Sequence, residues 1–103
     1  MGNLENLWEK GNSEIVQDSA IPLPPEKKVV FFNDDFTTMD FVVDVLISIF
    51  NKPEEEAESI MLKVHKEGQA IVGTYTYDIA VSRANLTKQL ARKNGFPLRV
   101  EVE

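Results

Sequence analysis

The sequence contains no cysteine, which excludes disulfide bonds, thiolate nucleophiles and thiolate metal ligands. It has a single histidine, His65, so a metal site built from several imidazoles is also excluded. Basic residues are few: 11 Lys and Arg stand against 17 Asp and Glu, for a formal net charge of −6. Nucleic-acid backbones and anionic membrane surfaces both attract basic faces, so this balance argues against either as a partner.

Long apolar runs are absent as well. No segment reaches transmembrane length, and the N-terminal residues are polar and acidic, unlike those of a signal peptide. We therefore expect a cytoplasmic protein. Its 103 residues, of which 43% are hydrophobic and 27% charged, fit one small globular domain with a thin core.

Residues 1–26 differ in composition from the rest of the chain. They hold five acidic residues and one lysine, a net charge of −4, and they close with Pro22, Pro24 and Pro25. Their apolar residues are too sparse to build a core, so we expect a flexible N-terminal extension that ends in an extended proline linker. The folded domain is then expected to span residues 27–103.

Strand and helix periodicities alternate through the folded part. β-Branched and aromatic residues predict strands over residues 27–32 and 69–75, and alternating apolar and charged residues predict a third over 98–103. Apolar residues three and four positions apart predict a pair of helices between the first two strands and one helix over residues 76–93. The order β-α-α-β-α-β predicts an α+β fold, in which a three-stranded antiparallel sheet packs against three helices on one face.

Capping residues predict where the helices begin and end. We expect Thr37 as the N-cap of the first helix, Pro53 as the first residue of the second, and Gly68 as its stop. The third helix is expected to turn its apolar residues inward. These are Ile79, Ala80, Ala84, Leu86, Leu90 and Ala91.

Polar candidates for a functional site fall at two places. Asn33, Asp34 and Asp35 follow the first strand, and their oxygens suit a cation, either a metal ion or an ammonium group. Their spacing alone favours an ordinary turn. His65 offers an acceptor nitrogen when it is neutral, although a lone histidine near an apolar face is more often a packed or surface residue.

An apolar set accompanies them on the two predicted helices: Met39, Val42, Met61 and Val64. Their helical spacing favours a place in the core. The alternative is an adaptable apolar pocket, because methionine reshapes around varied guests.

Four motifs, taken together, resemble those of the ClpS family. They are residues 29–39 (VVFFNDDFTTM), 61–68 (MLKVHKEG), 70–76 (AIVGTYT) with Ile79-Ala80, and Pro97-Leu98. The resemblance covers residues 27–103 and implies the same α+β fold. It also implies a non-enzymatic adaptor that needs no cofactor or metal. ClpS proteins bind the free N-terminus of proteins that start with a bulky hydrophobic residue, an N-degron, and deliver them to a ClpA-type AAA+ unfoldase that feeds ClpP. We expect a monomer.

The resemblance further implies which residues bind. The cluster expected to hold the substrate's α-amino group is Asn33, Asp34, Asp35 and His65, with Thr37 at its rim. The residues expected around the first side chain are Phe31, Met39, Val42, Met61, Val64 and Leu98, with Met39 as gatekeeper. The residues expected to contact the unfoldase are Asp78 and Arg83. The chain departs from the family pattern at Thr38, where many members have proline, and at Lys66, which replaces a second histidine.

Two other function classes remain open from the residues alone. A hydrolytic or metal site would use Asp34, Asp35 and His65, but no nucleophile accompanies the histidine and the aspartate pair lacks further ligands. A plain protein-interaction domain is the other alternative. It differs from an N-degron adaptor in that acetylating a peptide's N-terminus would leave its binding unchanged.

Overall fold

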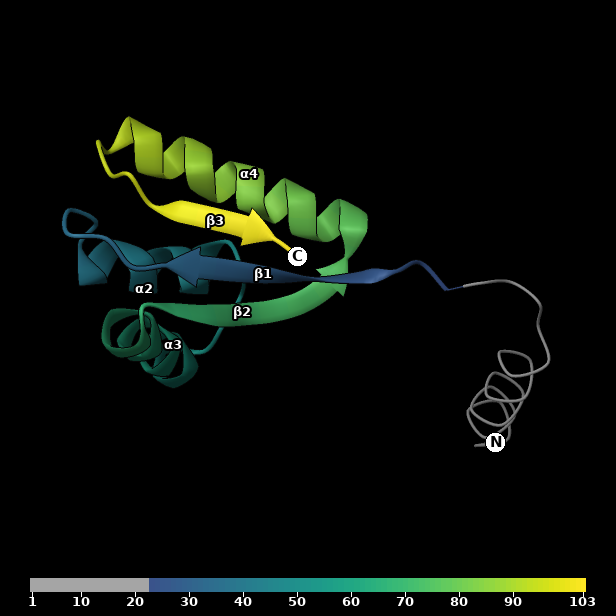
Figure 1. Ribbon diagram of the computed structural model, residues 1–103, viewed down its shortest axis with the longest axis horizontal. Coiled ribbons are helices and arrows are strands. Elements are labelled where there is room, and N and C mark those ends of the chain that lie inside the picture. Colours follow the sequence, from purple (N-terminus) through teal and green to yellow (C-terminus); the bar gives the residue numbers. More distant parts are fainter. Residues whose placement is uncertain (1–22) are drawn as a thin grey trace, which may run out of the picture.

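The structure, a computed structural model, describes residues 23–103. Most of the expected N-terminal extension, residues 1–22, lies outside the described residues. The elements run β1 (Glu26–Phe32), α2 (Met39–Ser48), α3 (Glu54–Glu67), β2 (Gln69–Thr76), α4 (Tyr77–Lys93) and β3 (Arg99–Val102) (Figure 1). This order confirms the predicted β-α-α-β-α-β arrangement.

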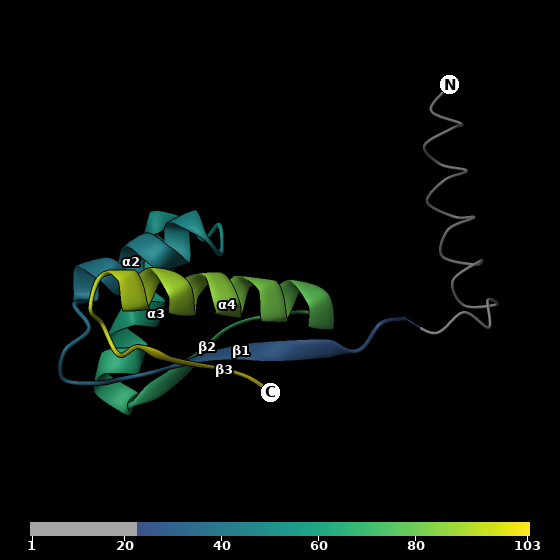
Figure 2. The same cartoon turned by 90° about the horizontal axis from the view of Figure 1, so that it is seen from above.

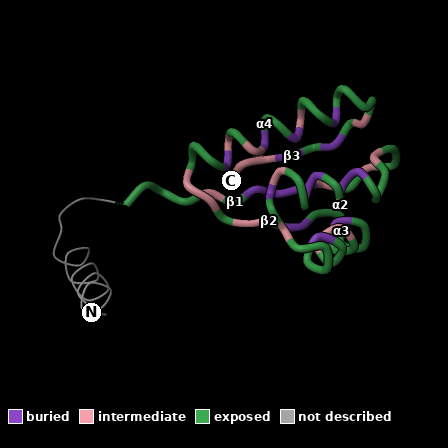
Figure 3. The backbone as a smooth tube through the Cα atoms, turned by 180° about the vertical axis from the view of Figure 1, so that it is seen from behind, coloured by how far each residue is buried: buried purple, intermediate pink, exposed green. Residues whose placement is uncertain are grey.

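The three strands form one antiparallel sheet in the order β2-β1-β3, so the first strand is central. The helices cover one face of the sheet, with α4 running along the strands and α2 packed against α3 near one end (Figure 2). Figure 3 shows buried residues along the central strand β1 and at intervals along α4. The predicted fold class is therefore confirmed.

The core is built from inward residues of all three strands and all three helices. Phe31 is fully buried and meets Phe50 edge to face, with ring centroids 5.6 Å apart. Phe41 meets Phe96 in the same way at 5.0 Å. Aromatic pairs in this geometry add stabilisation beyond the area they bury. The first pair joins the segment after α2 to β1, and the second joins the start of α2 to the loop after α4.

Two predicted helix starts are off by one residue. The N-cap of α2 is Thr38, whose Oγ1 accepts a hydrogen bond from the Phe41 backbone N–H at 3.2 Å. Thr37 belongs to the preceding turn, where its hydroxyl donates to Asp34. In the second helix Pro53 is the extended N-cap residue, and the helix begins at Glu54. The Thr38 side chain thus supplies the cap that the sequence predicted for Thr37.

The end of α3 and the end of β1 are tied together. Gly68 terminates α3 as predicted, in the left-handed conformation with φ 91°. This conformation costs glycine little and other residues more. The Gly68 carbonyl then accepts a hydrogen bond from the Asn33 backbone N–H at 2.9 Å. This bond brings the turn after β1 beside the last turn of α3.

The buried face of α4 differs from the prediction. Ala80, Ala84 and Ala91 are buried as expected, but Ile79, Leu86 and Leu90 are 44%, 53% and 36% exposed. Thr87 takes a buried position instead, and its hydroxyl donates to the carbonyl of Arg83 one turn earlier at 2.8 Å. The helix therefore presents small residues to the sheet and larger apolar residues to solvent.

Candidate functional site

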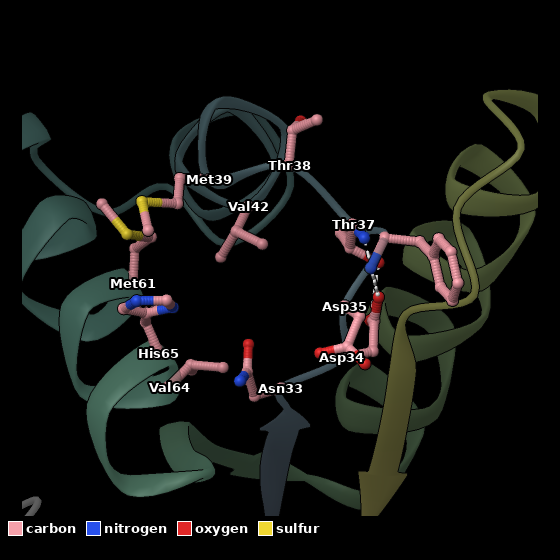
Figure 4. Close-up of a pocket in the computed structure, with 11 residues that line it drawn as sticks. Asn33, Asp34, Asp35, Thr37, Thr38, Met39, Val42, Met61, Val64 and His65 are labelled. Atoms are coloured by element: carbon pink, nitrogen blue, oxygen red, sulfur yellow. Dashed lines mark hydrogen bonds between the residues drawn. The ribbon is translucent and has the colours of Figure 1, made fainter.

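A pocket opens where β1 ends, α2 begins and α3 ends. Its volume is about 400 Å³, within the range of small-molecule sites. The residues that line it are Asn33, Asp34, Asp35, Phe36, Thr37, Thr38, Met39, Val42, Met61, Val64 and His65. Figure 4 shows Asn33 and Val42 pointing toward each other across the pocket, with His65 and Met61 on one side and the Asp34–Thr37 turn on the other.

The pocket has a polar side and an apolar side. Carboxylate, amide and imidazole groups come from the turn after β1 and from the last turn of α3. The apolar side comes from the first turns of α2 and the C-terminal half of α3, where Val42 and Val64 are buried and Met39 remains 44% exposed. Such a site can hold a cation and an apolar side chain that are part of the same molecule.

Asp34 holds the turn together. Its Oδ1 accepts hydrogen bonds from the backbone N–H groups of Phe36 and Thr37 at 2.8 and 2.7 Å, and its Oδ2 accepts one from the Thr37 hydroxyl at 2.7 Å. Burial raises the pKa of the Asp34 carboxyl, but the hydrogen bonds from Thr37 and Phe36 outweigh it and bring the pKa below its ordinary value. Asp34 is therefore a charged acceptor already engaged in shaping the loop.

The carboxylate of Asp35, unlike that of Asp34, is not engaged by its own loop. Among the described residues, none donates a hydrogen bond to its carboxylate or forms a salt bridge with it. It is exposed and lines the pocket, so its charge is available to a guest. The two adjacent aspartates thus stand in different situations, although the sequence gives them the same chemistry.

The structure brings most of the sequence-derived site residues together. The four expected amine-binding residues, Thr37 and four of the six expected side-chain pocket residues all line the same cavity. Phe31 and Leu98 are not among the lining residues. Phe31 lies in the core against Phe50, and Leu98 lines a separate groove between α4 and β3.

Two lining residues were not among the predicted site residues. Phe36 is 73% exposed at the tip of the turn, and Thr38 caps α2. Phe36 had a sequence signal: it is an aromatic residue set among polar ones and outside any helical or strand period. Asp78 and Arg83 lie on α4, apart from the pocket.

Metal binding has no geometric support in this part of the chain. Across residues 23–103, no three histidine, aspartate or glutamate side chains gather closely enough to hold a metal ion. None of the helices described here is long and apolar enough to cross a membrane.

Comparison with known proteins identifies the family. Residues 22–101 match the family model described as ATP-dependent Clp protease adaptor protein ClpS. The chain belongs to the ClpS family. An ATP-dependent Clp protease adapter protein ClpS of Treponema denticola is 58% identical over 100 residues, which cover 97% of this chain and 96% of the relative. A ClpS of Desulforapulum autotrophicum is 49% identical over 101 residues, covering 98% of this chain and 95% of that protein.

A solved ClpS structure has the same fold. The structure of Agrobacterium tumefaciens ClpS2 bound to L-phenylalaninamide superposes with a TM-score of 0.75 and is 34% identical, covering 79% of this chain and 98% of that chain. The predicted membership of the ClpS family is confirmed, and the chain is an adaptor of a Clp protease. Its relatives are named as adapters rather than as enzymes.

Proposed function

We propose that this protein recognises N-degrons: it binds the free N-terminus of proteins that begin with Leu, Phe, Tyr or Trp and delivers them to a ClpA-type AAA+ unfoldase for degradation by ClpP. The observation that carries the proposal is that one pocket combines polar groups on one side with apolar groups on the other. A protein's first residue has the matching form, because its ammonium group and its side chain leave the same carbon atom.

The polar side suits an ammonium group. A free N-terminus is a cation with three N–H donors, and it needs acceptors placed around it. Asn33 offers an amide oxygen, Asp35 a free carboxylate, and His65 a ring nitrogen when it is neutral. An internal peptide group has one donor and no charge, so it would leave these acceptors unpaired.

The apolar side suits a large hydrophobic side chain. Met39, Val42, Met61 and Val64 line it, and burying a Leu or Phe side chain there contributes about 1.5–3 kcal/mol. A Lys or Glu side chain would lose its hydration without gaining a partner. Methionine adapts to guests of different shape, which fits a site that accepts both aliphatic and aromatic residues.

The bound molecule in the Agrobacterium tumefaciens relative supports this assignment. L-Phenylalaninamide has a free α-amino group, a benzyl side chain and a neutral amide in place of the carboxylate, so it resembles the first residue of a chain. Because this chain shares its fold and family with that protein, a ligand with a free α-amino group and a hydrophobic side chain is the first to test here.

The binding test compares a Leu-initiated peptide with the same peptide acetylated at its N-terminus, by isothermal titration calorimetry. Acetylation removes the charge and two of the donors, so binding of the acetylated peptide should fall at least tenfold. His65→Ala should weaken binding of the free peptide, and Lys63→Ala, two residues earlier on α3 and outside the pocket lining, is the control. Equal affinity for the two peptides would refute N-degron recognition.

The delivery test measures degradation of a Leu-initiated protein by a ClpA-type unfoldase with ClpP. Adding the adaptor should accelerate degradation of this substrate and leave an otherwise identical Ser-initiated protein unaffected. Asp78→Ala and Arg83→Ala should impair delivery without changing peptide affinity, because both residues lie on α4 outside the pocket. Delivery that is normal in both variants would show that the unfoldase contacts lie elsewhere.

A further inference from the structure

The second half of β2 carries a glycine and a tyrosine on the face covered by the helices. The pairing of β1 with β2 shifts between Val29 and Val30, which leaves Val72 as an extra residue on β2. A bulge of this kind changes which residues face the core. After the bulge, Gly73 and Tyr75, two positions apart, lie on one face of the strand. The Tyr75 ring neighbours Phe50, which follows α2, and Arg83 on α4.

The Tyr75 ring lies over Gly73 and occupies the place of a side chain there. A Cβ atom built on Gly73 would lie 2.5 Å from the Tyr75 hydroxyl oxygen and 2.8 Å from Cζ. Both distances are far below van der Waals contact, so any side chain at this position displaces the ring. The backbone of Gly73 is not in the left-handed conformation. A glycine is needed here because the absence of a side chain leaves room for the Tyr75 ring.

Tyr75 in turn contacts Arg83 on α4. The guanidinium carbon of Arg83 lies 5.1 Å from the centroid of the Tyr75 ring, within the range of a cation–π interaction. The ring also neighbours Phe50, with centroids 5.9 Å apart. Arg83 forms no salt bridge with any residue that the structure describes. The ring is therefore the side-chain contact that orients its charge.

Arg83 occupies a particular place on α4. Ile79, Arg83, Leu86 and Leu90 are spaced four, three and four residues apart, so they form one stripe along the helix. The three apolar members of the stripe are at least 36% exposed. A planar guanidinium fixed within an apolar surface is well suited to a carboxylate of a partner protein.

We propose that Tyr75, seated over Gly73, is a positioning residue that holds the Arg83 guanidinium in the orientation in which it binds a carboxylate on the ClpA-type unfoldase. The inference rests on the proposed function, because it assumes that Arg83 contacts the unfoldase. Gly73 acts through Tyr75, and Tyr75 acts through Arg83.

The test is a double-mutant cycle on the affinity of the full chain for the purified unfoldase, measured by biolayer interferometry. Tyr75→Leu and Gly73→Ala should each weaken binding about two- to fivefold, the effect expected of a lost cation–π contact. Tyr75→Phe keeps the ring and should bind as the parent does. Once Arg83→Ala has been introduced, adding Tyr75→Leu should cause no further loss. Additive losses in the double variant would overturn the positioning role.

Tyr75→Leu could weaken binding only because it destabilises the fold, and Phe50→Leu is the control for this effect. This substitution removes a neighbouring ring of Tyr75 but neither partner of the Tyr75–Arg83 contact. It should lower the melting temperature and leave unfoldase affinity unchanged, and a loss equal to that of Tyr75→Leu would overturn the proposal. The Leu-initiated peptide should bind all variants equally.

Failure of the inference and failure of the proposed function give different results. If Arg83→Ala leaves unfoldase affinity unchanged, the assumed Arg83 contact is wrong and the inference fails with it. If Arg83→Ala weakens binding while Tyr75→Leu and Gly73→Ala do not, only the positioning role is refuted.

Discussion

Asp34 and Asp35 should respond differently to the same substitution. Asp34 already accepts three hydrogen bonds from its own loop, whereas Asp35 accepts none from the described residues. In Asp34→Asn the amide oxygen can still accept the two backbone N–H groups that Oδ1 holds now. In Asp35→Asn the charge available to the substrate's ammonium group is lost. The two variants are therefore a matched pair that separates shaping the loop from binding the guest.

The expected magnitudes follow from the energies of the bonds involved. A hydrogen bond to a charged group contributes about 1.5–3 kcal/mol, and one between neutral groups about 0.5–1.5 kcal/mol. Asp35→Asn should therefore weaken binding of a Leu-initiated peptide by about 1 kcal/mol, roughly fivefold. Asp34→Asn keeps two of the three loop bonds and should cost no more than about twofold, whereas Asp34→Ala removes all three and should cost about tenfold.

Isothermal titration calorimetry with the Leu-initiated peptide, at fixed pH and salt, measures all three affinities. The acetylated peptide measured beside it shows whether any change concerns the amine. The assignment is refuted if Asp34→Asn weakens binding as much as Asp34→Ala while Asp35→Asn binds normally. That result would mean that the Asp34 charge contacts the ammonium group directly and that Asp35 does not.

Three further predictions concern the gate, acid stability and the end of α3. Met39→Ala should open the pocket to Val- and Ile-initiated peptides, and an unchanged specificity profile in competition binding would remove Met39 from the gate. The folded state holds the pKa of Asp34 below its ordinary value of 3.8, so its carboxylate stabilises the fold at neutral pH and loses this effect as the pH falls below that value. Denaturant unfolding of Asp34→Asn and the parent should therefore differ at pH 7 and converge in acid. Gly68→Ala should destabilise the protein by about 1 kcal/mol in the same measurement, because φ is 91° and no atom obstructs the added methyl group.

The sequence was sufficient for the fold because its periodic signals are strong and local. The strand at Glu26–Phe32 and the helix that ends at Gly68 each begin or end within a residue of the predicted position. Single residues at helix starts were less predictable. Thr37 and Thr38 are both good N-caps by residue type, and the sequence does not reveal that Thr38 caps the helix while the Thr37 hydroxyl donates to Asp34.

The site depends on a contact that no local pattern reveals. Asn33 and His65 are distant in sequence, and the bond from the Asn33 N–H to the Gly68 carbonyl is what places the turn beside α3. Residue types suggested a cation site and an apolar pocket separately. A shared motif can also suggest a pocket residue that the structure places elsewhere. Phe31 belongs to the same motif as the pocket residues, but the alternation of side chains along the strand points it into the core.

The outward stripe of α4 shows why hydrophobicity alone misplaced its face. Ile79, Leu86 and Leu90 outrank alanine in hydrophobicity, so periodicity assigned them to the core. However, a helix that lies close along a sheet has room only for small side chains between the two layers, and Ala80 and Ala84 fill it. Exposing large apolar residues on a stripe next to a fixed arginine costs solubility without helping the fold. The stripe includes Arg83, the residue proposed to contact the unfoldase, which is why the variants of Tyr75 and Arg83 should be measured against the unfoldase first.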